Sequence, residues 1–187
     1  MDDDELLEAI RVAVRKQRGY ADFYHWHDKR QKEAGILESF EEGARRLQIE
    51  LTNTQLEKEG RDPPDAWTLC GTRKIALELT EFVDASLIGE QKRTGVAQSR
   101  TWNHSEFSVK LESIITGKDH GGFGKLADFW LVIHCDEPAL TSSMIAEYCE
   151  ESGAFETSGL DRCFVLLSYD PQIVSYPVIE VSVRRAS

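Results

Sequence analysis

The apolar positions of the chain follow two kinds of spacing, which predict helices that alternate with strands. Apolar residues that recur every three or four positions predict helices over residues 3–17, 29–48, 105–118 and 140–152. Alternating or continuous apolar runs predict strands over residues 65–69, 74–80, 129–134, 163–169 and 178–183. The polar stretch 49–61 is predicted to be a loop or a frayed helix.

This order of elements predicts an α/β fold with a mixed central sheet. Strands separated by helices are typical of parallel pairs joined by right-handed crossovers. The first two strands are joined only by a tight turn at Gly71, so they form an antiparallel hairpin. We therefore expect a mixed sheet flanked by helices on both faces, with the last strand at an edge.

The hairpin over residues 62–80 carries two acids in unusual places. Alternation along the second strand places Glu78 among apolar neighbours, where a carboxylate is costly unless something compensates it. Asp65 opens the partner strand, directly after two prolines that favour an extended chain. Two carboxylates on adjacent strands can converge on one cation, and hard divalent ions such as Mg²⁺ bind carboxylate oxygens and water.

Pro64-Asp65, a turn and then Glu78-x-Thr80 in an apolar strand resemble the PD-(D/E)XK nuclease-like superfamily. The resemblance implies a restriction-endonuclease-like core over residues 29–183, similar to small bacterial proteins of that superfamily. It also implies that Asp65 and Glu78 bind Mg²⁺ or Mn²⁺, and that a lysine two residues after the acid helps to activate water. Thr80 stands where that lysine is expected, which puts catalysis in question.

Lys118 is the candidate for the missing lysine. It follows Ile114 by four residues and Ile115 by three, so it continues the apolar face of its helix and can point toward the sheet. Some members of the superfamily carry the lysine on this helix. The alternative is that Lys118 only interacts with the C-terminal end of the helix dipole. Lys74 is a weaker candidate, because it lies about 13 Å from Glu78 along the strand.

Glu33 is the candidate for a third metal ligand. Its spacing from Ile36 and Phe40 places it on the apolar stripe of helix 29–48, which is unusual for an acid. The resemblance implies that an acid on this helix can reach the metal. The alternative is an acid near the start of a helix that is stabilised by the helix dipole.

A locally basic strip over residues 86–104 is the candidate nucleic-acid-binding segment. Basic side chains beside an aromatic ring can hold a sugar-phosphate backbone and stack a base. A surface loop without any ligand explains the same composition. The residues concerned are Lys92, Arg93, Arg100 and Trp102.

Length and charge limit the organisation and the partners. The 187 residues predict a single domain over 1–187, with a helical and aromatic N-terminal extension over residues 1–28. The helix in this extension is a candidate oligomer contact, and His25 and His27 leave open a zinc site or ordinary aromatic packing. A net charge of −11 disfavours broad electrostatic binding of nucleic acid and suits a basic protein partner.

Neither a membrane nor an oxidising compartment is indicated. No apolar run approaches the ~20 residues that span a bilayer, and the acidic N-terminus is unlike a secretory signal, so we expect a cytoplasmic protein. The four cysteines lack the spacing of zinc ligands, and Cys135 and Cys163 are expected to be buried thiols.

Two functions follow. One is a divalent-metal-dependent nuclease that hydrolyses phosphodiester bonds of DNA or RNA. The other is a catalytically inactive domain of the same fold that acts as a protein-interaction or structural subunit. Asp65 and Glu78 close together and open to solvent would favour the first, and a buried ion pair on Glu78 would favour the second. The signatures of a serine or cysteine nucleophile are missing from the sequence.

Overall fold

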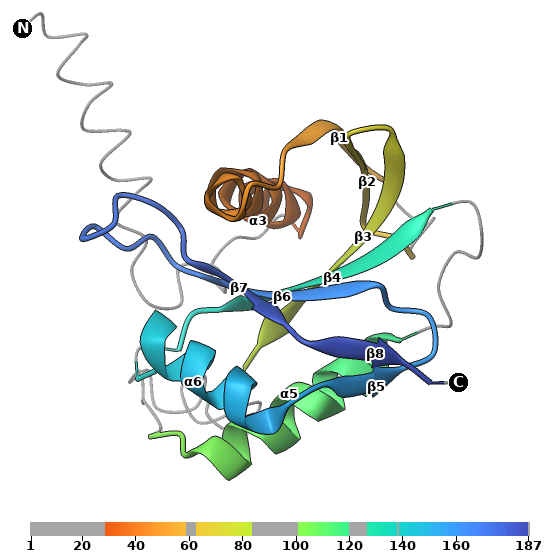
Figure 1. Cartoon of the computed structure of the whole chain (residues 1–187). Helices are drawn as coiled ribbons and strands as arrows, with labels where there is room; N and C mark the ends of the chain where they lie inside the picture. The colour runs from red at the N-terminus through yellow and green to blue at the C-terminus, as the bar shows by residue number, and fades with distance from the viewer. Residues whose placement is uncertain (1–28, 59–62, 84–100, 120–126, 138, 187) are drawn as a thin grey trace, which may run out of the picture.

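A six-stranded mixed sheet lies between layers of helices in the computed structural model, which describes residues 29–58, 63–83, 101–119, 127–137 and 139–186. Helix α3 (Lys29–Ala44) covers one face of the sheet, and α5 (His104–Lys118) and α6 (Ser142–Ser152) cover the other (Figure 1). The strands, in their order across the sheet, are β1 (Leu51–Leu56), β2 (Ala66–Cys70), β3 (Arg73–Phe82), β4 (Asp128–Cys135), β6 (Arg162–Leu167) and β7 (Val178–Val181).

The pairing of the strands confirms the predicted α/β class. Strands β3, β4 and β6 are mutually parallel and are joined through α5 and α6, whereas β1, β2 and β7 are antiparallel to their neighbours. The turn between β2 and β3 uses Gly71 at φ +61°, a backbone conformation that favours glycine. The peptide bond between Pro63 and Pro64, before β2, is cis.

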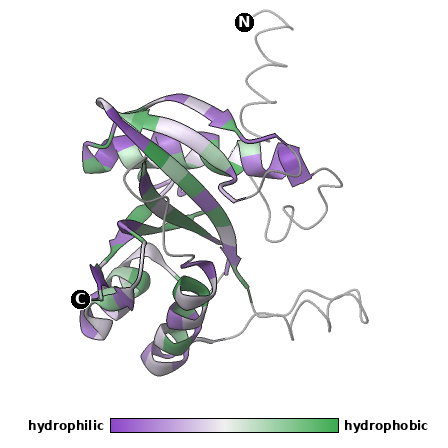
Figure 2. Ribbon diagram, turned by 90° about the vertical axis from the view of Figure 1, so that its right-hand side faces the viewer, coloured by the Kyte–Doolittle hydropathy of each residue, from purple (hydrophilic) through white to green (hydrophobic). Residues whose placement is uncertain are grey.

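Two apolar cores, one on each face of the sheet, hold the helices in place. Alternation along β3 sends Ile75 and Leu77 toward α3, and Ala76 and Phe82 toward α5. The middle strand β4 is buried along nearly its whole length, as its continuous apolar run predicted. Figure 2 shows hydrophobic residues concentrated in these central strands, between the helices.

The prediction that residues 49–61 form a loop or a frayed helix was wrong, because Leu51–Leu56 form the edge strand β1. Most of the β1 side chains are polar and partly or fully exposed, and its pairing with β2 is interrupted by a register shift between Thr52 and Gln55. An edge strand is held by main-chain bonds to one neighbour, so it needs no apolar run. The short parallel pair β5 (Phe155–Thr157) and β8 (Val183–Arg185) was not predicted.

Element boundaries differ from the predictions by a few residues. Helix α3 ends at Ala44 and is followed by a 3-10 turn, Arg45–Leu47, and a left-handed Gln48. Helix α5 begins after Asn103, whose side chain accepts from the main-chain N–H of Glu106 in a capping box. Cys135 and Cys163 are buried free thiols, as expected, and burial raises the pKa of Cys135 to about 12.

Some predicted features fall outside the described residues. Among them is the N-terminal extension 1–28, with its helix and with His25 and His27. Of the helices that the structure does describe, none combines the length and the apolar character needed to cross a membrane.

Gly43 provides a test of how α3 packs on the sheet. A Cβ at this position would lie 2.3 Å from the main-chain oxygen of Tyr176 and 2.5 Å from Cγ2 of Val178. We expect Gly43→Ala to lower the free energy of unfolding by about 1–3 kcal/mol, because overpacking outweighs the gain of about 1 kcal/mol in helix propensity. Urea-induced unfolding measures this change.

The matched control is Gly117→Ala in α5, where a Cβ would meet nothing within 4 Å. This variant is expected to be as stable as the unmodified protein or more stable, because only helix propensity changes. Equal stability of the two variants would contradict the packing of α3 described above.

Candidate functional site

Asp65 and Glu78 meet where β2 begins beside β3. The last paired residues of the hairpin are Ala66 and Leu77, so Asp65 lies one step further along, next to Glu78. Oδ2 of Asp65 accepts a hydrogen bond of 2.7 Å from the main-chain N–H of Leu79, which fixes this carboxylate against β3. Both acids are buried, with exposed fractions of 7% for Asp65 and 5% for Glu78.

The surroundings of Asp65 disfavour its charged form. Burial is the largest cause, and together with the nearby carboxylates of Glu78 and Glu33 it raises the pKa of Asp65 from 3.8 to about 6. The N–H of Leu79 and the ammonium of Lys118 act in the opposite direction and only partly offset this rise. Negative charge is therefore concentrated at this point of the fold.

Only one of the two carboxylate oxygens of Glu78 has a hydrogen-bond partner among the described residues. Its Oε1 accepts a hydrogen bond of 2.8 Å from Nζ of Lys118, and its side chain is 7% exposed. Its Oε2 is fully buried and has no hydrogen-bond partner among the described residues. An unsatisfied buried acceptor costs about 1–3 kcal/mol, and more when it is charged, so a cation placed beside this oxygen and the second carboxylate would remove that cost.

These features fit a divalent cation that is held by one or two carboxylates and completed by water and substrate oxygens. They do not provide a cage made by the protein alone. Within the described ranges, no three His, Cys, Asp or Glu side chains lie close enough together to hold a metal ion.

The structure places Lys118 beside Glu78, on the side of α5 where the helical spacing predicted it. The residue belongs to the last turn of the helix, so it also lies at the negative end of the helix dipole. Both interpretations of its sequence position are therefore compatible with its location. Its side chain is 33% exposed, which leaves the ammonium in contact with solvent on one side.

Glu33 and Lys74 take up other positions. Glu33 is near enough to Asp65 to raise its pKa, yet its carboxylate pairs with Lys29 at 3.2 Å and does not complete a three-acid metal site. Its role as a third ligand stays a prediction. Nζ of Lys74 lies 3.7 Å from the centre of the Trp67 ring, which is a cation–π contact away from Glu78.

The predicted nucleic-acid-binding strip needs one correction. Trp102 is 3% exposed and packs edge-to-face against Phe82, with ring centroids 5.0 Å apart. Its ring belongs to the core beneath α5, so it is not presented for stacking on a base. Lys92, Arg93 and Arg100 lie outside the described residues.

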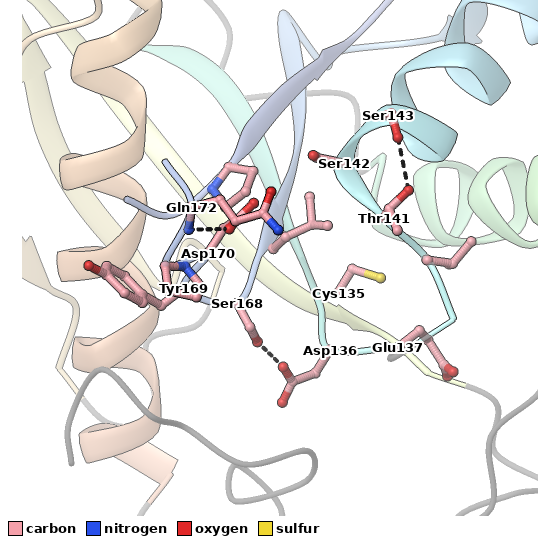
Figure 3. Close-up of a pocket in the computed structure, with 14 residues that line it drawn as sticks. Cys135, Asp136, Glu137, Thr141, Ser142, Ser143, Ser168, Tyr169, Asp170 and Gln172 are labelled. Carbon is pink, nitrogen blue, oxygen red and sulfur yellow. Dashed lines mark hydrogen bonds between the residues drawn. The ribbon is translucent and has the colours of Figure 1, made fainter. Parts of the chain in front are cut away.

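A hollow of about 560 Å³ at the carboxyl ends of β4 and β6 was missed at the sequence level (Figure 3). Asp136 and Glu137 follow β4, Ser168 and Asp170 follow β6, and Ser168 donates a hydrogen bond to Asp136. The acids that directly follow the two predicted strands could have indicated this hollow, because the ends of neighbouring parallel strands meet at one edge of the sheet. No Lys, Arg or His is among the described residues that line it, so phosphate groups are disfavoured there.

His104 joins α5 to α6 in an arrangement that superficially resembles a catalytic triad. Its Nδ1 lies 3.4 Å from a carboxylate oxygen of Glu151, and its Nε2 lies 3.1 Å from Oγ of Ser152. The hydroxyl of Ser152 donates to the carbonyl of Tyr148 at 2.7 Å and also bonds the hydroxyl of Ser108 on α5. These bonds tie the last turn of α6 to the first turns of α5, so the group acts as a helix–helix junction.

Comparisons with known proteins give little further guidance. No protein-family model matches the chain, and no curated protein matches it. Among solved structures, the chain is similar to SfsA of Pyrococcus furiosus in complex with Ca²⁺, with 15% sequence identity and a TM-score of 0.29. The match covers 82% of this chain and 63% of SfsA, so the chain spans less than two thirds of that protein. At this similarity, the match establishes neither an activity nor a ligand for this chain.

The raised pKa of Asp65 predicts how stability depends on pH without metal. Asp65 holds its proton more tightly in the folded chain than in the unfolded chain, so its contribution to the free energy of unfolding falls as the pH rises from about 4 to about 6. The rise from 3.8 to about 6 corresponds to about 3 kcal/mol at most. We expect Asp65→Asn to be more stable than the unmodified protein by about 1–3 kcal/mol at pH 7.5, and equally stable near pH 4. Urea-induced unfolding in a chelating buffer measures the difference.

Asp161→Asn is the matched control. Asp161 also accepts a main-chain N–H, that of Phe129 at 2.7 Å, but its other oxygen pairs with Arg185 at 2.8 Å. Its neutralisation is expected to lower stability at pH 7.5, because the ion pair is lost. If Asp65→Asn also lowered stability at this pH, Asp65 would be a structural acid.

Proposed function

We propose that this protein is a divalent-metal-dependent nuclease that hydrolyses phosphodiester bonds of nucleic acid. The observation that carries the proposal is the pairing of Asp65 and Glu78 on adjacent strands, with Oε2 of Glu78 buried and unsatisfied among the described residues. In a fold kept only for stability, two neighbouring buried acids are costly, and only the bond from the N–H of Leu79 and the ion pair with Lys118 offset that cost. A site that binds a cation uses both of them.

Each residue of the site has a chemical role in this proposal. Asp65 and Glu78 would hold Mg²⁺ or Mn²⁺, and Asp65 is aimed by its hydrogen bond from the main chain of Leu79. When bound, such an ion lowers the pKa of a coordinated water and stabilises negative charge on the phosphate. Lys118 would supply the positive charge that Thr80 lacks and would orient the attacking water or a phosphate oxygen.

Nucleic acid as the substrate follows from the resemblance of Pro64-Asp65 and Glu78-x-Thr80 to nuclease motifs. The net charge of −11 requires that any affinity for phosphate comes from a few local cations and from the bound metal. Lys118 is one such cation, and the strip with Lys92, Arg93 and Arg100 is proposed to supply others.

The ion pair between Lys118 and Glu78 also supports a second candidate function, that of a catalytically inactive domain. The ion pair between Lys118 and Glu78 neutralises the buried acid, and Asp65 is largely shielded from water. A buried ion pair on Glu78, and acids that are closed to solvent, are the features that the sequence predicted for a domain that keeps the fold without chemistry. In that case the acidic surface would serve to bind a basic protein.

Calorimetric titration of Mn²⁺ distinguishes the two functions. We expect the unmodified protein to bind one ion with a dissociation constant below about 1 mM, and Asp65→Ala to weaken binding at least tenfold, because one of two carboxylate ligands is lost. Protein that binds Mn²⁺ would then be incubated with DNA and RNA to measure cleavage. Cleavage is expected to depend on both the metal and Asp65.

Glu81→Gln is the matched control. Glu81 lies on β3 as Glu78 does, but it pairs with Lys32 of α3. Its neutralisation removes one negative charge from the same strand and is expected to change the Mn²⁺ affinity by less than about threefold. Absence of Mn²⁺ binding by the unmodified protein at millimolar metal would reject the nuclease proposal and favour the inactive domain.

A further inference from the structure

We infer that Lys118 and the metal compete for Glu78, so that Lys118 leaves this carboxylate when the metal binds and only then becomes available to the substrate phosphate. This inference rests on the proposed function and concerns the order of events at the same site. Its basis is that Nζ of Lys118 lies 2.8 Å from the carboxylate that is proposed to hold the cation.

The ammonium of Lys118 occupies the place beside Glu78 that a metal ion would take. Glu78 lies within β3 and its side chain is 7% exposed, so packing around it leaves it less room to move than the lysine has. One of its oxygens is occupied by the ammonium, and the other is buried without a partner among the described residues. A second cation can reach this carboxylate only in the immediate neighbourhood of Nζ, where two positive charges repel each other.

The mobile partner in this competition is the lysine. Its side chain is 33% exposed and has four rotatable carbon–carbon bonds, so it can move its ammonium toward solvent. The main chain next to Lys118 is fixed by hydrogen bonds of Asp119. The N–H of Asp119 donates to the carbonyl of Ile115 at 2.9 Å, and a carboxylate oxygen of Asp119 accepts from Gly159 N–H at 2.9 Å. Displacement is therefore confined to the side chain of Lys118.

The consequence is a coupling between metal and substrate binding. Without metal, the ammonium is engaged by Glu78 and is a poor ligand for phosphate. With metal bound, the same ammonium is released within reach of the site and can hold a phosphate oxygen as a point charge. The buried ion pair, which otherwise favours an inactive domain, is then the metal-free form of an active site.

Calorimetric titration of Mn²⁺ into Lys118→Met tests the competition. The variant removes the competing ammonium and is expected to bind Mn²⁺ about fivefold more tightly than the unmodified protein, the factor that corresponds to losing a partly exposed ion pair. Lys110→Met removes the same charge from the same helix and is expected to change affinity by less than twofold. Lys118→Arg keeps the charge and is expected to retain the lower affinity.

A second measurement titrates the unmodified protein and needs a variant only to assign the Lys118 signals. Nuclear magnetic resonance of the lysine side chains, assigned with Lys118→Arg, follows the Nζ and Cε signals during titration with diamagnetic Mg²⁺. We expect the Lys118 signals to shift with the same dissociation constant as the metal, and the Lys110 signals to stay in place.

Three outcomes are distinguishable. Tighter Mn²⁺ binding by Lys118→Met, together with the Lys118 shift, supports the inference. Equal or weaker binding by Lys118→Met, or an unshifted Lys118 signal at saturating Mg²⁺, overturns the inference and leaves the metal site intact. Absence of metal binding by the unmodified protein and by Lys118→Met alike overturns both the inference and the proposed function.

Discussion

The interaction on which the site depends is the ion pair between Glu78 and Lys118. A carboxylate in the middle of β3, beneath a helix and beside a second acid, is stable only if a cation stands next to it. Helix α5 supplies that cation from its last turn, after packing Phe107, Leu111 and Ile115 against the same face of the sheet. The apolar core therefore determines where the ammonium lies.

The same arrangement lowers the free energy of unfolding of the metal-free protein. Asp65 is held against the main chain of Leu79 in surroundings that raise its pKa to about 6, so its ionised form weakens the metal-free fold at neutral pH. Such a cost is typical of positions that are arranged for a ligand, because binding sites concentrate like charges that the ligand later neutralises. Together with the unsatisfied oxygen of Glu78, this cost is the physical argument for a cation.

The spacing of apolar residues and glycines predicted those features that depend on residues close together in the sequence. The buried run of β4, the glycine turn of the hairpin and the location of Lys118 on the inner face of α5 all follow from periodicity and turn chemistry. Strand β1 escaped prediction because it is held by pairing and not by an apolar pattern. Trp102 was assigned to a surface for its basic neighbours in sequence, whereas its burial depends on Phe82, twenty positions away. The hollow after β4 and β6 required knowing that these strands are neighbours.

The metal site is tested most directly by the anomalous diffraction of a crystal grown with Mn²⁺. We expect an anomalous peak between the carboxylates of Asp65 and Glu78, with Nζ of Lys118 moved away from Glu78. A crystal with saturating Mn²⁺ that shows no peak at these carboxylates and keeps the ion pair between Lys118 and Glu78 would rule out this metal site. The domain would then be one that keeps this fold without metal chemistry.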